Sequence, residues 1–113
     1  MFKLGLIQMR VLGGQKQENL RHAEDLIRHA AAAGAEVLVL PEALTLGSTD
    51  SSAKLEADEI PGGESCFRFQ QAARENGVFV CAGLVERHGA KIFNAAVLID
   101  PEVNVLFHHR KLN

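Results

Sequence analysis

The sequence has little of what marks several protein classes. Its two cysteines, Cys66 and Cys81, are too few for a disulfide framework and indicate a reducing, cytoplasmic compartment. No apolar run approaches the ~20 residues that cross a bilayer, so we expect no membrane segment. The net charge of −2 gives no basic surface for nucleic acid.

Motifs for metals and nucleotides are also lacking. His108 and His109 are adjacent on an expected strand, where neighbouring side chains point to opposite faces, so the two cannot share one metal ion. Gly13 and Gly14 fit neither the Walker pattern nor the dinucleotide fingerprint. We therefore expect no metal and no cofactor, and we interpret the remaining histidines as structural or solvent-facing: His22, His29 and His88.

What is present predicts an α/β fold. Apolar residues recur at three-and-four spacing over 17–33, which predicts a helix, and Gly34 stands where its left-handed cap would lie. A second helix is expected over 65–76. Strands are expected over 2–10, 37–40, 78–86, 91–100 and 103–111. This order predicts one domain, 1–113, whose mixed sheet begins with a right-handed β-α-β unit and ends in an antiparallel meander.

Two segments between these elements differ from ordinary strands and turns. The continuous apolar run 37–40 suits a strand that is buried on both faces. The Gly-, Ser- and Pro-rich stretch 43–63 predicts a long loop with a short helical turn near 53–57. Loops of this length in compact domains are usually functional or disordered.

Glu42 and Lys111 are the candidate catalytic residues. Glu42 directly follows the apolar strand, and a partly desolvated carboxylate at that place would have a raised pKa suited to general-base chemistry. Lys111 closes the last strand, where an ammonium can stabilise an oxyanion. The alternative for Glu42 is a carboxylate that only keeps the strand end in contact with water. The alternative for Lys111 is an exposed lysine that keeps the sheet edge from pairing with another strand.

Neither cysteine is expected to be the nucleophile. Cys81 lies in the middle of a strand, where cysteine behaves as a small buried apolar residue. Cys66 falls in the first turn of the second helix, where the helix dipole would lower the thiol pKa. The sequence places no base at a fixed distance from it.

An ordered set of short motifs covers essentially the whole chain and resembles the nitrilase family of carbon–nitrogen hydrolases. The main motifs are AGAEVLVLPE at 33–42, EIPGG at 59–63, ENGVFVCAGL at 75–84, IFNAAVLIDP at 92–101 and RKLN at 110–113, with Gln8, Asn19, Leu20 and Gly47. The resemblance implies a longer α-β-β-α sandwich that forms homo-oligomers. It also implies that Glu42 is the general base and that Lys111 stabilises the oxyanion when a thiolate attacks an amide or nitrile.

In the nitrilase family the catalytic cysteine follows a later strand. The resemblance therefore implies that chain 1–113 is an incomplete N-terminal part that is inactive alone. A further glutamate that the family often places after the lysine is also absent from it. An amidase acting on a small molecule is expected rather than a nitrilase, because RKLN resembles the RKINEL-like variant. Alternatives are a non-catalytic module that binds a partner through its sheet edge and one half of a split enzyme. The sequence departs from the family's pattern at two positions. Val103 stands where the family often has Gly, and we expect Asn104 to take the unusual backbone angle instead. Phe93 stands where a Tyr is common.

Overall fold

The computed structural model describes residues 2–47 and 51–111. Residues Ser48 and Thr49 of the long loop, and Leu112 and Asn113 of the RKLN motif, lie outside this part. The elements are β1 (Leu4–Leu6), α1 (Lys16–Ala32), β2 (Val37–Val39), α2 (Ala53–Glu56), α3 (Glu64–Asn76), β3 (Phe79–His88), β4 (Lys91–Ile99) and β5 (Val105–Lys111).

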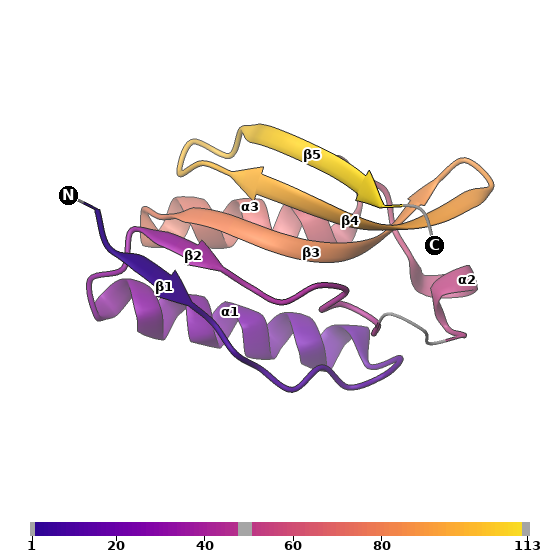
Figure 1. The fold of residues 1–113 in the computed structure, drawn as a ribbon, viewed down its shortest axis with the longest axis horizontal. Coiled ribbons are helices and arrows are strands. Elements are labelled where there is room, and N and C mark those ends of the chain that lie inside the picture. Colours follow the sequence, from indigo (N-terminus) through magenta and orange to yellow (C-terminus); the bar gives the residue numbers. More distant parts are fainter. Residues whose placement is uncertain (1, 48–50, 112–113) are drawn as a thin grey trace.

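The five strands form one mixed sheet in the order β1-β2-β3-β4-β5 (Figure 1). Strands β1, β2 and β3 are parallel neighbours, whereas β3, β4 and β5 pair antiparallel. The predicted element order, the mixed sheet and the closing meander are therefore confirmed. Figure 1 shows α1 and α3 side by side on one face of the sheet.

The main core lies between the helices and this face. Leu20 and Ile27 of α1 and Phe69 of α3 are fully buried, and they pack against alternate residues of the sheet such as Leu38 and Val80. The amphipathic stripe predicted for the first helix is confirmed, and Gly77 ends α3 with a left-handed φ of 63°. Among the described residues, no helix combines the length and the apolar character needed to cross a membrane.

The opposite sheet face is largely open, so the expectation that 37–40 is buried on both faces is only half correct. Leu38 is buried, but Val37 and Val39 of β2 are half-buried. Nearby on this face, Leu4 is 55% exposed and Leu6 is 72% exposed. The physical reason is that, within the described residues, helices cover the other face alone.

The extent of the first strand and the turn between β3 and β4 differ from the prediction. The first strand is Leu4–Leu6 rather than 2–10, because β2 ends at Val39 and leaves later residues without a ladder partner. The turn expected at 87–90 is shorter, because Arg87 and His88 still pair with β4. The hairpin therefore turns at Gly89, whose φ is 61°.

The turn between β4 and β5 corrects a third expectation. Val103, rather than Asn104, takes the left-handed backbone angle, with φ 66°. The Asp100 carboxylate accepts hydrogen bonds from the backbone N–H of Glu102 and Asn104 and from the Asn104 side chain. The Asn104 side-chain bond is the main cause that lowers the pKa of Asp100. Because Asn104 is held in this way, the sharp backbone angle falls on Val103.

Candidate active site

Glu42 leaves the sheet directly after β2 and begins a tight turn. The Leu40 N–H still donates to the Cys81 carbonyl at 2.8 Å, and Pro41 then carries the chain out of the sheet. Ala43, the next residue, has φ 47°, an angle that residues other than Gly rarely adopt. Such strain often occurs at functional sites because the surrounding structure enforces it.

Gly83 of β3 fixes the position of this turn. Its N–H donates to the Pro41 carbonyl at 3.2 Å, and its own carbonyl accepts from Leu44 at 2.9 Å. A Cβ on Gly83 would lie 2.5 Å from the Cα of Glu42. Glycine is therefore needed here, because it lets the Glu42 backbone lie directly against the sheet.

Buried Asn19 holds the other side of the turn. Its amide nitrogen donates to the carbonyls of Thr45 and Leu12, at 2.9 and 2.8 Å, and its oxygen accepts from the Leu12 N–H at 2.9 Å. The Thr45 hydroxyl accepts from the Val85 N–H at 3.2 Å. Sequence reasoning noted Asn19 as part of a motif but did not assign it this structural role.

Lys111 lies at the end of β5, on the same edge of the sheet as Glu42. Because β2 is parallel to β3, and β3, β4 and β5 alternate in direction, β2 and β5 run the same way. Their carboxyl ends therefore meet at one edge. Glu42 and Lys111 both line one pocket of about 70 Å³, together with Ala43, Gly83, Asn94, Ala95, Ala96 and His109.

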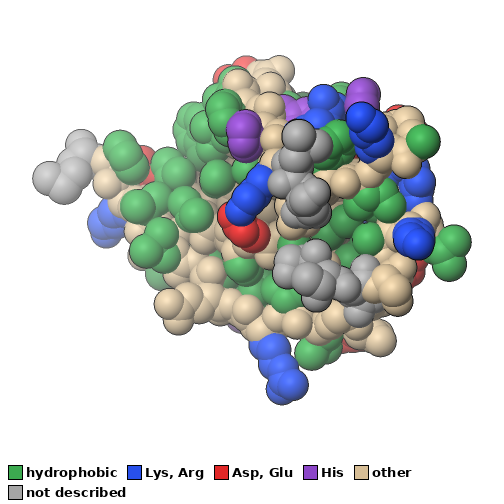
Figure 2. All heavy atoms as spheres, turned by 45° about the vertical axis from the view of Figure 1, so that its right-hand side comes forward, with side chains coloured by type: hydrophobic (Ala, Val, Ile, Leu, Met, Phe, Trp, Pro, Cys, Tyr) green, Lys and Arg blue, Asp and Glu red, His purple; other side chains and the backbone are tan. Residues whose placement is uncertain are grey.

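Glu42 and Lys111 thus share one rim of the sheet, and the loop that begins after Glu42 borders the pocket through Ala43. The partial desolvation expected for Glu42 is not present, because Glu42 is exposed, as is Lys111. Both lie in the described part of the chain, and they form no direct ion pair there. Figure 2 turns this end of the molecule toward the viewer and shows hydrophobic side chains at the surface between charged ones.

The two cysteines do not belong to this pocket. Cys66 is fully buried, and burial, together with the carboxylates of Asp58 and Glu86, raises the pKa of its thiol to about 11. The expectation that the helix end would lower this pKa is wrong, because burial and two nearby carboxylates outweigh the dipole. Cys81 is half-buried within β3, and burial raises its pKa as well. Neither thiol is in a disulfide.

The histidines behave as the strand alternation predicted. The His108 Nε2 lies 2.9 Å from Glu86 Oε1 on one side of β5, whereas His109 lines the pocket on the other side and stacks on Phe107. His22, His29 and His88 are exposed. Across residues 2–47 and 51–111, no group of three or more His, Cys, Asp or Glu side chains could hold a metal ion.

Glu86 is a buried carboxylate that sequence reasoning missed. It is fully buried on β3 and accepts two hydrogen bonds from Arg110, Nε to Oε1 at 3.0 Å and Nη2 to Oε2 at 3.1 Å. A signal was available, because residue 86 continues the alternation that buries Leu84. Its side-chain partners, His108 and Arg110, occupy alternate positions of the last strand.

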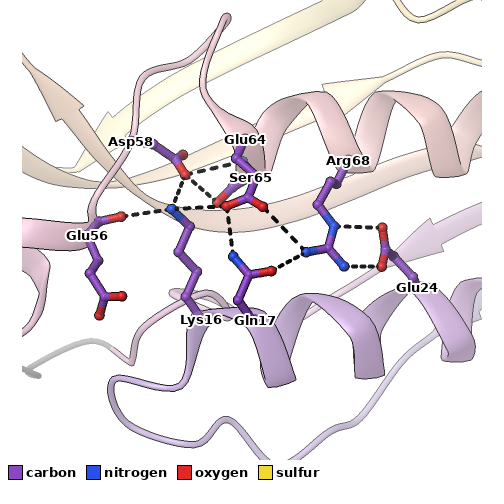
Figure 3. Close-up of polar contacts among 8 residues, drawn as sticks. All are labelled: Lys16, Gln17, Glu24, Glu56, Asp58, Glu64, Ser65 and Arg68. Carbon is purple, nitrogen blue, oxygen red and sulfur yellow. Dashed lines mark hydrogen bonds and ion pairs between the residues drawn. The ribbon is translucent and has the colours of Figure 1, made fainter.

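A second polar network lies on the helical side of the sheet and has a structural role (Figure 3). Lys16 at the start of α1 pairs with Asp58 at 2.6 Å, and Asp58 accepts from the backbone and the hydroxyl of Ser65 at the start of α3. Further along, the Arg68 Nε donates to Glu24 at 3.0 Å and joins the two helices. These contacts fix the helices against each other, away from the Glu42 pocket.

Comparison with known proteins identifies the family. The carbon–nitrogen hydrolase family model matches residues 3–113, so the chain belongs to the carbon–nitrogen hydrolases. An omega-amidase from Xenopus tropicalis is 34% identical over 113 residues, which are 99% of this chain and 40% of that protein. A nitrilase from Pyrococcus abyssi is 34% identical over 104 residues, which are 89% of this chain and 40% of that protein.

Solved structures of the same superfamily share the fold. An amidase from Nesterenkonia superposes with a TM-score of 0.82 at 22% identity, over 99% of this chain and 43% of that one. A superfamily member from Xanthomonas campestris superposes with a TM-score of 0.86 at 18% identity, over 99% of this chain and 41% of that one. The chain thus spans less than half the length of these proteins. In another structure of the Nesterenkonia amidase, the acetamide moiety of fluoroacetamide is added covalently at the active site cysteine.

Proposed function

We propose that the protein hydrolyses the carbon–nitrogen bond of a small-molecule amide, with Glu42 as the general base and Lys111 as the cation for the oxyanion. The observation that carries the proposal is the single pocket that both side chains line at one edge of the sheet. The family assignment supports it, because this chemistry needs a base within reach of the nucleophile and a fixed positive charge near the carbonyl oxygen.

The nucleophile would be a cysteine other than Cys66 and Cys81, outside these 113 residues. Glu42 would accept the thiol proton as the sulfur attacks the amide carbon, and Lys111 would stabilise the negative charge on the oxygen. Glu42 would then return the proton to the departing amine, leaving an acyl-thioester. Water would attack this thioester, with Glu42 again as the base, and would release the acid and the thiol.

Several further points belong to the same proposal. An amide substrate is favoured over a nitrile because the similar proteins include an omega-amidase and the Nesterenkonia amidase. The two unpaired cysteines favour a reducing, cytoplasmic compartment. The open apolar sheet face favours contact with further protein, including a homo-oligomer.

The test is the hydrolysis of aliphatic amides by the full-length protein, followed as ammonia release. Glu42→Gln and Lys111→Met should each lower kcat by roughly 10²–10³-fold, the range for loss of an oxyanion donor or a general base. Glu36→Gln and Lys91→Met remove exposed charges outside the pocket and should leave kcat unchanged. Retention of full activity by Glu42→Gln would show that the catalytic assignment is wrong. The 113-residue chain alone should release no ammonia, with or without Cys66→Ala.

A second candidate function is a non-catalytic module that binds a partner, or one half of a split enzyme. The open face of the sheet favours it, because Leu6 and Phe107 are 72% and 55% exposed there. Reading the gene beyond codon 113 separates the candidates. An open frame that encodes a strand followed by cysteine supports the hydrolase, whereas a stop codon supports the module or the split enzyme.

A further inference from the structure

We propose that Glu86 is the positioning residue of Lys111, acting through Arg110. This inference rests on the proposed function, since it concerns the residue that would carry the oxyanion charge. Glu86 itself does not line the pocket that Glu42 and Lys111 share. It acts from the opposite face of the sheet, through the strand that carries Lys111.

Glu86 spans the sheet from β3 to β5, past β4. Its Oε1 accepts from Arg110 Nε at 3.0 Å and lies 2.9 Å from His108 Nε2, while its Oε2 accepts from Arg110 Nη2 at 3.1 Å. Between them on β4, the Arg110 guanidinium lies over the Phe93 ring, 5.8 Å from its centroid. Two positions of β5 are thereby tied to one carboxylate on β3.

Because side chains alternate along β5, fixing Arg110 on one face of the sheet also fixes the direction in which Lys111 points on the other face. His108 and Arg110 project to the helical face, where Glu86 is buried, whereas His109 and Lys111 line the pocket on the other face. When the Arg110 side chain is held against Glu86, the peptide plane between residues 110 and 111 is held as well. Lys111 must then project toward Glu42 rather than away from it.

Strand β5 needs such an anchor because little else restrains it. In the described part of the chain it pairs with β4 alone, and the register shifts between Leu98 and Ile99. Most of its side chains are exposed. A slip by one residue would exchange the two faces and would point Lys111 at the helices.

The buried Glu86 carboxylate favours the native register of β5 over other registers. Glu86 is 0% exposed, so its charge must be matched by cations at fixed places. Arg110 presents two parallel N–H donors that a lysine cannot reproduce. Only the native register places this fork, with His108, against both carboxylate oxygens.

The experiment measures the position of Lys111 directly. In the 113-residue chain, a carbodiimide should couple the Glu42 carboxyl to the Lys111 amine, and the product can be quantified by mass spectrometry. Glu86→Gln keeps the side-chain shape but removes the charge. It should lower the coupling yield about fivefold or more, as expected if the orientation of Lys111 toward Glu42 loses ~1 kcal/mol of stabilisation. Glu24→Gln is the matched control, because Glu24 binds Arg68 between the helices and should leave the yield unchanged.

The outcomes separate the two proposals. Unchanged coupling in a folded Glu86→Gln protein overturns the positioning role and leaves the pocket assignment standing. Absence of coupling in the unmodified chain overturns the pocket and the positioning role together. If Glu86→Gln fails to fold, Arg110→Lys gives the same test, since it keeps the positive charge and loses the fork. A yield in Arg110→Lys equal to that of the unmodified chain would also overturn the proposal.

Discussion

The backbone of Glu42 lies directly against Gly83, so that a Cβ on Gly83 would lie 2.5 Å from the Cα of Glu42 and 2.8 Å from the Pro41 carbonyl oxygen. Real Cβ atoms do not approach backbone atoms this closely. Glu42, the candidate general base, can therefore take this position only because residue 83 on the neighbouring strand has no side chain.

Gly83→Ala should accordingly displace Glu42 from the pocket. The added methyl group meets backbone atoms, which cannot rotate away, so the turn at Pro41–Ala43 must move. We expect the carbodiimide coupling of Glu42 to Lys111 to fall sharply while the helical circular dichroism signal persists. Gly89→Ala is the control for general backbone strain, because alanine is strained at its φ of 61° while its Cβ would meet nothing within 4 Å. An equal loss of coupling in both variants would contradict this account.

The positions of Glu42 and Lys111 at strand ends could be predicted because the relevant signals are local. The apolar run before Pro41 and the alternation of the last strand place Glu42 and Lys111 at strand ends. The directions of the strands then bring those ends to one edge. The alternation that buries Leu84 extends to Glu86, but the Arg110 side chain that pairs with this carboxylate lies on another strand, so the pairing has no local signal in the sequence. The same limit explains the wrong pKa expectation for Cys66, since the position in the helix is local, whereas burial and the nearby carboxylates depend on the whole fold.

Val103→Gly should stabilise the fold. Val103 has φ 66°, and a β-branched residue in this region is strained by roughly 1–2 kcal/mol. Glycine removes this strain but gains entropy in the unfolded chain, so we expect a net increase of about 0.5–1 kcal/mol in the free energy of unfolding. Urea titration followed by circular dichroism measures it.

Asn104→Gly is the informative comparison for that measurement. Asn104 holds Asp100 through its side chain and does not have the left-handed angle. Glycine at 104 should therefore lower the free energy of unfolding. If Asn104→Gly were stabilising and Val103→Gly were not, the assignment of the strained angle would be wrong.

The buried thiol of Cys66 should make stability fall at alkaline pH. Its pKa is about 11 in the folded chain, above the ordinary value of 9.0, so between these values the unfolded chain loses the proton while the folded chain keeps it. The contribution of this thiol to stability is therefore constant below pH 9 and decreases as the pH rises toward 11, by up to roughly 2–3 kcal/mol. Unfolding at a series of pH values measures this, and Cys66→Ala should flatten the profile.

The same burial predicts the order of alkylation. At pH 8 in the folded chain, iodoacetamide should modify half-buried Cys81 before fully buried Cys66. Peptide mass spectrometry gives the two rates. Faster modification of Cys66 would contradict its raised pKa and would make it a candidate nucleophile again.

The 113-residue chain should associate with itself through the open sheet face. Leu4, Leu6 and Phe107 are 55%, 72% and 55% exposed, and they lie on the face that the helices do not cover. Charging two of them, Leu6→Glu with Phe107→Glu, should shift the chain toward monomer because a buried carboxylate opposes the contact. Sedimentation velocity over a range of protein concentrations measures the change.

Leu55→Glu is the matched control for this experiment. Leu55 is 89% exposed, more than Leu4, Leu6 or Phe107, but it belongs to α2. If exposure alone drove association, Leu55→Glu would reduce it as much as the double variant does. If the sheet face drives it, Leu55→Glu should sediment as the unmodified chain. A chain that remains monomeric at all concentrations, with one cooperative unfolding transition, would show that this face does not require a cover.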